Sequence, residues 1–168
     1  MAELNARPIV FPLSNPSTKA ECTFEDAMVA TGNRVIFASG TAFPAYTIPN
    51  TTTTVAPAQG NNMYIFPGLG LGAVLAQPQY ISNAMIYKAA KALADSLTVQ
   101  ERKQGWLYPS LDRIREVSAV VAAAVCREAI DEGNANAEIQ AAFNKKQLLA
   151  YIENRMWSPE PKQIKNKI

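Results

Sequence analysis

The α/β class of this chain is decided by residues 8–40, which read PIVFPLSNPSTKAECTFEDAMVATGNRVIFASG. Residues 8–14 form a short apolar run bounded by turn residues, which predicts a buried strand, although Pro12 cannot donate a hydrogen bond to a neighbouring strand. Residues 23–32 begin with a threonine that can cap a helix and end near a glycine that can terminate it. The apolar run at 34–39 predicts a second strand, so the segment reads as strand, helix, strand.

After residue 40 the pattern changes from strands to helices. Residues 41–60 are rich in proline and threonine and are expected to form a surface loop. Residues 61–67 fit either a third strand or the first turns of a helix, and Pro67 favours the helix. Caps and apolar spacing predict further helices at 82–96, 98–105, 111–132 and 137–155. The charged residues that open the third of these, among them Arg113, are expected to form a solvated face.

A chain in which strands alternate with a helix at first and only helices follow is typical of an α/β domain of which the chain contains one part of the sheet. We therefore expect the second half of a doubly wound parallel sheet, followed by a helical C-terminal region. In such a sheet, ligands bind beyond the carboxyl ends of the strands. Asn15 directly follows the first expected strand, so it is well placed to contact a ligand.

Composition argues against several classes of protein. The 16 basic and 14 acidic residues leave a net charge of +2, which is too small to indicate a nucleic-acid partner. The longest apolar run, at 118–126, is far shorter than a membrane span, which needs about 20 residues. The chain has no histidine, which rules out His-based catalysis and His metal ligands. Cys22 and Cys126 are expected to be free thiols in a reducing compartment.

The glycine-rich stretch at 68–73 has two interpretations. It matches the dinucleotide-binding pattern G-x-G-x-x-G/A, but the acidic residue expected about 20 positions further on is absent, and the next one is Asp95. The alternative is that Gly68, Gly70 and Gly72 allow a helix to pack closely against a neighbour. We favour the packing interpretation and keep the nucleotide loop as a weaker hypothesis.

Three asparagines are the strongest candidates for a binding role. Asn15 lies in LSNP, and Asn61 and Asn62 lie in QGNN. A carboxamide offers both a donor and an acceptor, so it can bind a carboxylate or pair with another carboxamide without adding charge. Asn-Pro and Gly-Asn are also ordinary turn pairs. Spacing alone favours the turn interpretation.

Five segments of the chain are distinctive: LSNPSTKAEC at 13–22, IFASG at 36–40, QGNNMYIFPGLGLG at 59–72, GWLYPSLDRIREVS at 105–118 and RMWSP at 155–159. In this order and at roughly this spacing they resemble the malic enzymes, and the resemblance covers nearly the whole chain. It implies a Rossmann-like fold, with the C-terminal part of the malic-enzyme NAD(P)-binding domain at 1–135 and a helical C-terminal tail at 136–168.

The resemblance also implies a function. Malic enzymes oxidise malate at its hydroxyl-bearing carbon, pass a hydride to NAD or NADP, and decarboxylate the product to pyruvate with the help of Mg or Mn. In that family Asn15, Asn61 and Asn62 would line the cleft between the substrate and the nicotinamide and orient both. The resemblance places no catalytic residue and no metal ligand in this chain. Tyr64 and Tyr108 lie in family motifs, but we expect them to be packing groups.

The family's catalytic tyrosine and lysine, its acidic metal ligands and its dinucleotide loop all precede the LSNP segment, and this chain starts only a few residues before it. We therefore expect the isolated chain to be inactive. Unpaired strand edges should favour a homo-oligomer or association with the missing N-terminal half. The alternative is a non-catalytic interaction module that binds a full-length malic enzyme. The expected location is intracellular, either cytoplasmic or mitochondrial.

One departure from the family pattern is visible. IFASG is followed by residues 41–43, Thr-Ala-Phe, where the family usually has Ser-Pro-Phe. This wall of the site is therefore expected to differ slightly.

Overall fold

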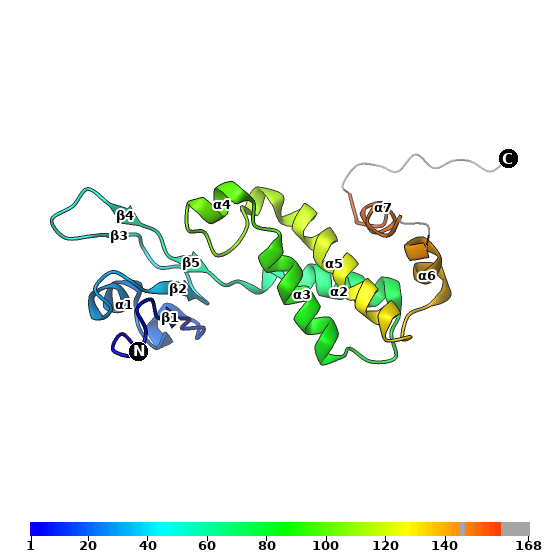
Figure 1. Ribbon diagram of the computed structural model, residues 1–168, viewed down its shortest axis with the longest axis horizontal. Helices are drawn as coiled ribbons and strands as arrows, with labels where there is room; N and C mark the ends of the chain where they lie inside the picture. The colour runs from blue at the N-terminus through cyan, green and yellow to red at the C-terminus, as the bar shows by residue number, and fades with distance from the viewer. Residues whose placement is uncertain (145–146, 159–168) are drawn as a thin grey trace.

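The computed structural model describes residues 1–144 and 147–158. The molecule is elongated (Figure 1): a small sheet lies at one end, a helical body forms the middle, and helices α6 (Ala137–Asn144) and α7 (Leu148–Glu153) lie at the other end. Two hydrophobic clusters, one at the sheet and one in the helical body, form separate cores.

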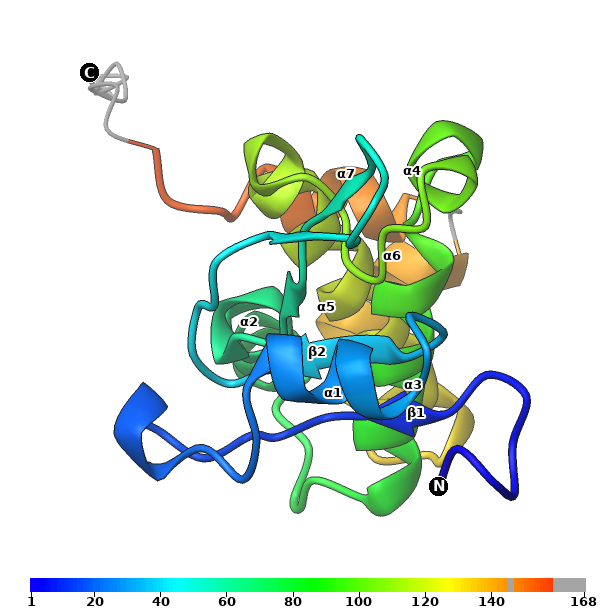
Figure 2. The same ribbon diagram turned by 90° about the vertical axis from the view of Figure 1, so that its left-hand side faces the viewer.

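Three parallel strands form the sheet in the order β1 (Ile9–Val10), β2 (Ile36–Ser39) and β5 (Ala58–Gln59). The central strand is β2, and Ile36 lies opposite Ile9 of β1. Seen end-on in Figure 2, β1 and β2 lie in front of the helical body. This arrangement confirms the predicted α/β class with a parallel sheet.

Helix α1 (Phe24–Ala30) connects β1 to β2. Its start is fixed by a reciprocal pair of hydrogen bonds, in which the Asp26 N–H donates to Thr23 Oγ1 and the Thr23 N–H donates to Asp26 Oδ2, both at 3.1 Å. Gly32 follows the last turn with a positive φ of 59°. The helix therefore begins and ends where the sequence predicts.

Residues 41–60 lie at the surface, as their composition predicts, but they are not entirely loop. They contain a hairpin of β3 (Tyr46–Thr47) and β4 (Thr54–Val55), followed by β5. Asn50 provides left-handed backbone at the turn, with a φ of 62°. Threonine hydroxyls on the two strands lie 3.0 Å apart. The expected surface location is confirmed, but the expected loop contains paired strands, which β-branched threonine favours.

The helical body is built around α5 (Ile114–Asp131), whose predicted apolar face is completely buried at Val117 and Val121. Helices α2 (Phe66–Ala76) and α3 (Asn83–Asp95) pack along it. The shorter helical segments are η1 (Ser17–Lys19), η2 (Asn62–Tyr64), α4 (Val99–Lys103) and η3 (Leu111–Arg113). None of the helices in the described part of the chain is long and apolar enough to cross a membrane.

The helix expected at 137–155 is two helices, α6 and α7. The Gln147 N–H donates to the Ala142 carbonyl oxygen at 3.0 Å, so the residue that precedes α7 is hydrogen-bonded to the last turn of α6. Ile139 of α6 and Ile152 of α7 are both completely buried in the same cluster as α5. The division of the chain at residue 135 stays a prediction.

Candidate functional site

The carboxyl ends of the three parallel strands meet at one edge of the sheet. Beyond β1 the chain stays paired with β2, because the Gly40 N–H donates to the Pro12 carbonyl oxygen at 3.0 Å. Beyond β5, the Gly60 N–H donates to the carbonyl oxygen of Ser39, the last residue of β2, at 2.8 Å. Parallel sheets bind ligands at this edge. We call it the strand-end site, and it comprises Asn15, Gly40, Gly60, Asn61 and Asn62.

Gly40 has no room for a side chain. A methyl group at this position would lie 2.4 Å from the Leu13 carbonyl oxygen and 3.2 Å from the Asn15 amide nitrogen. The Asn15 turn therefore passes directly over the end of β2. The Asn15 side chain is exposed and makes no hydrogen bond to any residue that the structure describes, so its donor and its acceptor are both open to a ligand.

Asn61 shapes the fold and still leaves part of its carboxamide open. Its Oδ1 accepts a hydrogen bond from the Met63 N–H at 3.0 Å and caps η2. Its amide nitrogen has no hydrogen-bond partner among the described residues, and Asn62 beside it is exposed. The turn and the ligand-binding interpretations are therefore compatible, because the oxygen of Asn61 forms the turn and its nitrogen can bind.

The two asparagine turns adjoin each other. The Leu13 side chain, two residues before Asn15, reaches within 3.8 Å of a methyl group placed on Gly60, the residue before Asn61. Sequence reasoning did not single out Gly40 or Gly60 as part of the site. Each directly follows a strand, and that position is the signal that could have identified them.

A buried carboxylate is hydrogen-bonded to the loop at 105–110, whose Tyr108 lies beside Gly60. Glu101 is 6% exposed and accepts hydrogen bonds from the Ser110 N–H at 2.8 Å and the Thr98 N–H at 2.7 Å. These bonds, joined by the Arg113 guanidinium at 3.0 Å, lower the pKa of Glu101 to about 2. The predicted solvated role of Arg113 is therefore wrong, because its guanidinium pairs with a carboxylate in another helix.

We expect Glu101 to make the fold sensitive to acid. The pKa of its carboxyl is lower in the folded chain than the ordinary value of 4.5, so its contribution to stability is complete above about pH 5 and is lost as the pH falls towards 2. Glu101→Gln should therefore be less stable than wild type at neutral pH, and the two should converge near pH 2. Thermal unfolding followed by circular dichroism at several pH values measures this. A stability difference that does not change with pH would contradict the prediction.

The nucleotide-loop interpretation of residues 68–73 is wrong, because they lie within α2 and do not form a phosphate-binding loop. Gly68 and Gly72 instead face α5, where added methyl groups would lie 2.6 Å and 2.8 Å from the Cβ atoms of two valines. Gly70 has nothing within 4 Å, so it takes no part in this packing. The packing interpretation is confirmed for two of the three glycines.

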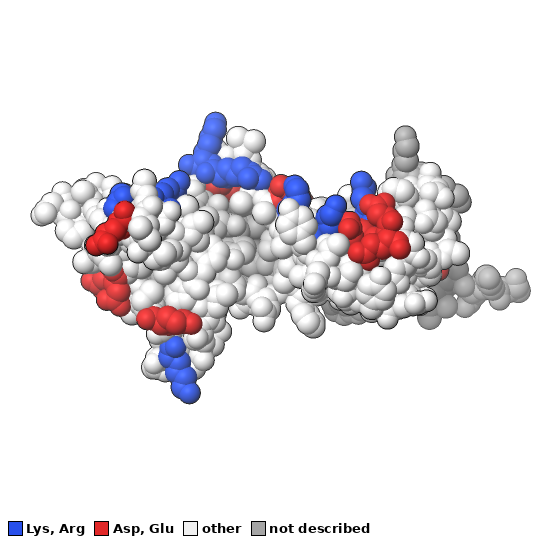
Figure 3. All heavy atoms as spheres, turned by 60° about the horizontal axis from the view of Figure 1, so that its bottom comes forward, with Lys and Arg blue, Asp and Glu red and all other residues white. Residues whose placement is uncertain are grey.

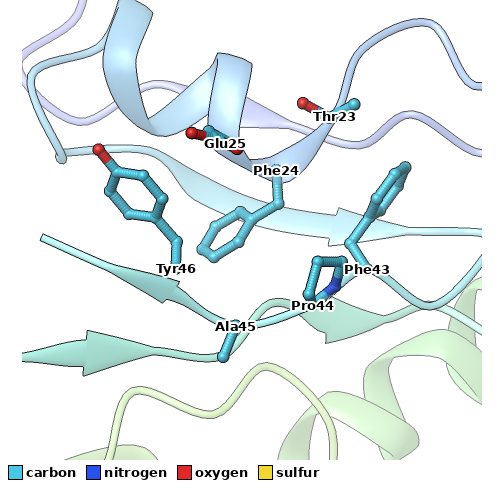
Figure 4. Close-up of a pocket in the computed structure, with 7 residues that line it drawn as sticks. All are labelled: Thr23, Phe24, Glu25, Phe43, Pro44, Ala45 and Tyr46. Atoms are coloured by element: carbon cyan, nitrogen blue, oxygen red, sulfur yellow. The ribbon is translucent and has the colours of Figure 1, made fainter.

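A separate cavity of about 160 Å³ lies between α1 and the segment before β3 (Figure 4). Its lining is mainly aromatic and apolar and contains none of the predicted asparagines. The lining residues are Thr23, Phe24, Glu25, Phe43, Pro44, Ala45 and Tyr46. We therefore do not assign this cavity to the strand-end site.

Acidic and sulfur side chains do not gather at the strand-end site. Residues 1–144 and 147–158 contain no group of three or more His, Cys, Asp or Glu side chains that could hold a metal ion. Both cysteines are free, as predicted. Burial raises the pKa of the Cys126 thiol to about 12, which keeps it protonated and unreactive.

Comparison with known proteins decides the family. Residues 1–130 match the family model described as the malic enzyme, NAD binding domain. The chain belongs to the malic enzyme family. This match and the parallel sheet confirm the predicted family and the Rossmann-like α/β fold, and they support a nicotinamide cofactor.

Relatives extend the match over nearly the whole chain. The mitochondrial NAD-dependent malic enzyme of Amaranthus hypochondriacus is 42% identical over an alignment of 163 residues, which covers 93% of this chain and 26% of that protein. The NADP-dependent malic enzyme of Dictyostelium discoideum is 42% identical over 166 residues, 99% of this chain and 29% of that protein. The human NADP-dependent malic enzyme is 38% identical over 164 residues, 98% of this chain and 28% of that protein. The chain thus spans little more than a quarter of the length of these relatives.

Proposed function

We propose that this chain supplies part of the wall that holds malate and the nicotinamide ring in a malic-enzyme site. The reaction is the oxidative decarboxylation of malate to pyruvate with NAD or NADP and a divalent Mg or Mn ion. The observation that supports the proposal is the convergence of Asn15, Asn61 and Asn62 at one edge of a parallel sheet, in a chain of this family.

The carboxamides fit a nicotinamide cofactor and a hydroxy acid. The open donor and acceptor of Asn15 can pair with the carboxamide of the nicotinamide, and the amide nitrogen of Asn61 can donate to a malate carboxylate. When bound, the cofactor accepts the hydride. The asparagines orient the two reactants and transfer no proton, so their contribution is positional. The described residues offer no acidic cluster for the metal ion, and no step in this proposal passes through it.

We further propose that the 168-residue chain alone does not oxidise malate. The polar side chains at the strand-end site are carboxamides, which neither accept nor donate protons near neutral pH. The relatives that catalyse the reaction are between three and four times as long as the matched region, because this region is only 26–29% of their length. Activity is therefore expected to need residues supplied from outside the matched region.

A direct assay tests this proposal. The pure chain is mixed with malate, Mn²⁺ and either NAD or NADP, and absorbance at the NAD(P)H maximum is followed. We expect no production above background. A complete malic enzyme assayed in parallel shows that the reagents work. If the pure chain produced NAD(P)H and Asn61→Ala abolished this activity, the place of Asn61 in the site would be supported but the claim of inactivity would be overturned.

Exposed apolar surface suggests what completes the site. On β1 and just beyond it, Ile9, Phe11 and Leu13 are 57%, 44% and 57% exposed, and Phe66 and Val74 on α2 are each 70% exposed. Figure 3 shows one side of the molecule, on which the charged side chains form separate groups and most of the described surface is uncharged. Apolar area of this kind is usually covered in a stable protein. We propose that the remaining three quarters of a malic enzyme covers it, inside the cell, in the cytoplasm or in a mitochondrion.

The same surface favours a second candidate function, a non-catalytic module that associates with a complete malic enzyme. Size-exclusion chromatography of the chain, alone and mixed with a complete malic enzyme, separates the possibilities. Co-elution with an altered rate of the complete enzyme supports the module. Elution as a homo-oligomer would mean that a second copy covers the apolar faces. A compact monomer that does not co-elute with the complete enzyme would contradict both association proposals.

A further inference from the structure

Tyr108, which was expected to be a packing residue, lies beside the strand-end site. It belongs to the loop between α4 and η3, yet its hydroxyl oxygen would lie 3.0 Å from a methyl group placed on Gly60. Gly60 directly precedes Asn61, and Leu13 contacts the same point from the Asn15 turn. The phenol group therefore lies where the two asparagine turns adjoin.

A comparison with Tyr64 shows that the Tyr108 hydroxyl is unusual. The two rings stack with centroids 5.0 Å apart, so they form one packed pair, in which Tyr64 is buried and Tyr108 is half-buried. The buried Tyr64 hydroxyl donates to the Pro109 carbonyl oxygen at 3.0 Å. The Tyr108 hydroxyl has no hydrogen-bond partner in the described part of the chain. Since no buried side-chain oxygen there lacks a partner, this hydroxyl is not fully buried and is accessible from outside the fold.

The surrounding contacts hold the phenol in place and keep it a donor. Glu101 fixes the loop through the Ser110 N–H, two residues after Tyr108. Stacking on Tyr64 fixes the plane of the ring. Burial raises the pKa of Tyr108, so its hydroxyl stays protonated across the physiological range. A fixed donor without a protein acceptor is a group that a ligand can use at little entropic cost.

We propose that the Tyr108 hydroxyl donates a hydrogen bond to a carboxylate or carboxamide oxygen of the ligand held at the strand-end site. The proposal rests on the function proposed above and adds a residue to it. Tyr108 then completes a set of polar groups with Asn15 and Asn61, each contributed by a different connection of the fold. It is a ligand-contacting residue and takes no proton from the substrate.

Two tyrosine variants of the full chain test the proposal. Tyr108→Phe removes a hydroxyl without a protein partner, so it should leave thermal stability unchanged and weaken ligand binding by about tenfold, as expected for a bond to a charged oxygen. Tyr64→Phe is the matched control. It leaves the Pro109 carbonyl without its partner, so it should lower stability and leave the affinity unchanged. Affinities are measured by NMR titration with L-malate, which supplies carboxylates, and with nicotinamide, which supplies a carboxamide.

The NMR signals of the Tyr108 ring and of the asparagine side chains separate the possible outcomes. If Tyr108→Phe has a lower affinity for only one of the two probes, L-malate or nicotinamide, the inference is supported and the oxygen that Tyr108 binds is identified. Asparagine signals that shift while Tyr108 does not respond, with equal affinity in Tyr108→Phe, overturn the inference and leave the proposed function standing. If high concentrations of both probes shift neither set of signals, the inference and the proposed function both fail.

Discussion

Replacing Gly68 with alanine is expected to lower the free energy of unfolding by about 3 kcal/mol, the upper end of the usual range for overpacking a core. The added methyl group would lie 2.6 Å from the Val121 Cβ and 2.7 Å from the Ser118 carbonyl oxygen. Both neighbours belong to the completely or nearly completely buried face of α5, so α2 has to move away from α5 as a whole. Urea unfolding followed by circular dichroism measures the loss.

Gly70→Ala is the matched control, because Gly70 lies two residues after Gly68 in the same helix. Nothing lies within 4 Å of its added methyl group, and alanine restricts the unfolded chain more than glycine does. This variant should therefore gain about 0.5–1 kcal/mol of stability. Equal effects of the two substitutions would contradict the close approach of α2 and α5.

The elements predicted well are those fixed by local contacts. The helices that begin after Thr23, Ser82 and Thr98 were expected at these positions, and each of the three side chains caps its helix. In every case the backbone N–H that is capped lies three residues further on, so the relevant contact lies within the sequence window that was read. The buried face of α5 was predictable for the same reason, because its spacing repeats along a single helix.

What depends on distant contacts was not predictable. Gly68 and Gly70 have almost identical neighbours in GLGLG, and only the position of α5 makes one essential and the other dispensable. Arg113 lies 12 residues from its buried partner Glu101, outside any helical period. The hairpin at β3 and β4 depends on pairing across a turn, which a run of threonines does not specify.

The candidate site shows the same division. The family motifs predict a binding role for Asn15, Asn61 and Asn62, which stays a prediction, and parallel strand order explains why two segments 46 positions apart lie at one edge. The close approach of the Asn15 turn to Gly40 and the position of Tyr108 beside Gly60 are visible only in the three-dimensional structure. Motifs therefore suggested the polar groups of the candidate site, and the structure added the neighbours of these groups at the strand ends.

Gly40→Ala is expected to have the largest effect on the strand-end site. The new methyl group would lie 2.4 Å from the Leu13 carbonyl oxygen, and a backbone atom cannot rotate away as a side chain can. The Asn15 turn must therefore move off β2, which strains the hydrogen bond from the Gly40 N–H to the Pro12 carbonyl. We expect a loss of about 3 kcal/mol in the free energy of unfolding. Binding of L-malate or nicotinamide should fall at least about tenfold, since a displacement of about 1 Å is costly in a positioned site.

Gly60→Ala distinguishes this explanation from a general intolerance of side chains at the strand ends. Its methyl group would lie 3.0 Å from the Tyr108 hydroxyl, a side-chain atom that can move by a few tenths of an ångström. Its stability loss should therefore stay at or below about 1 kcal/mol, the lower end of the overpacking range. Measured by urea unfolding and NMR titration, Gly40→Ala should be the more damaging of the two in both quantities. If Gly60→Ala proved equally damaging to stability, rigid contact with the Leu13 backbone would not be what makes Gly40 indispensable.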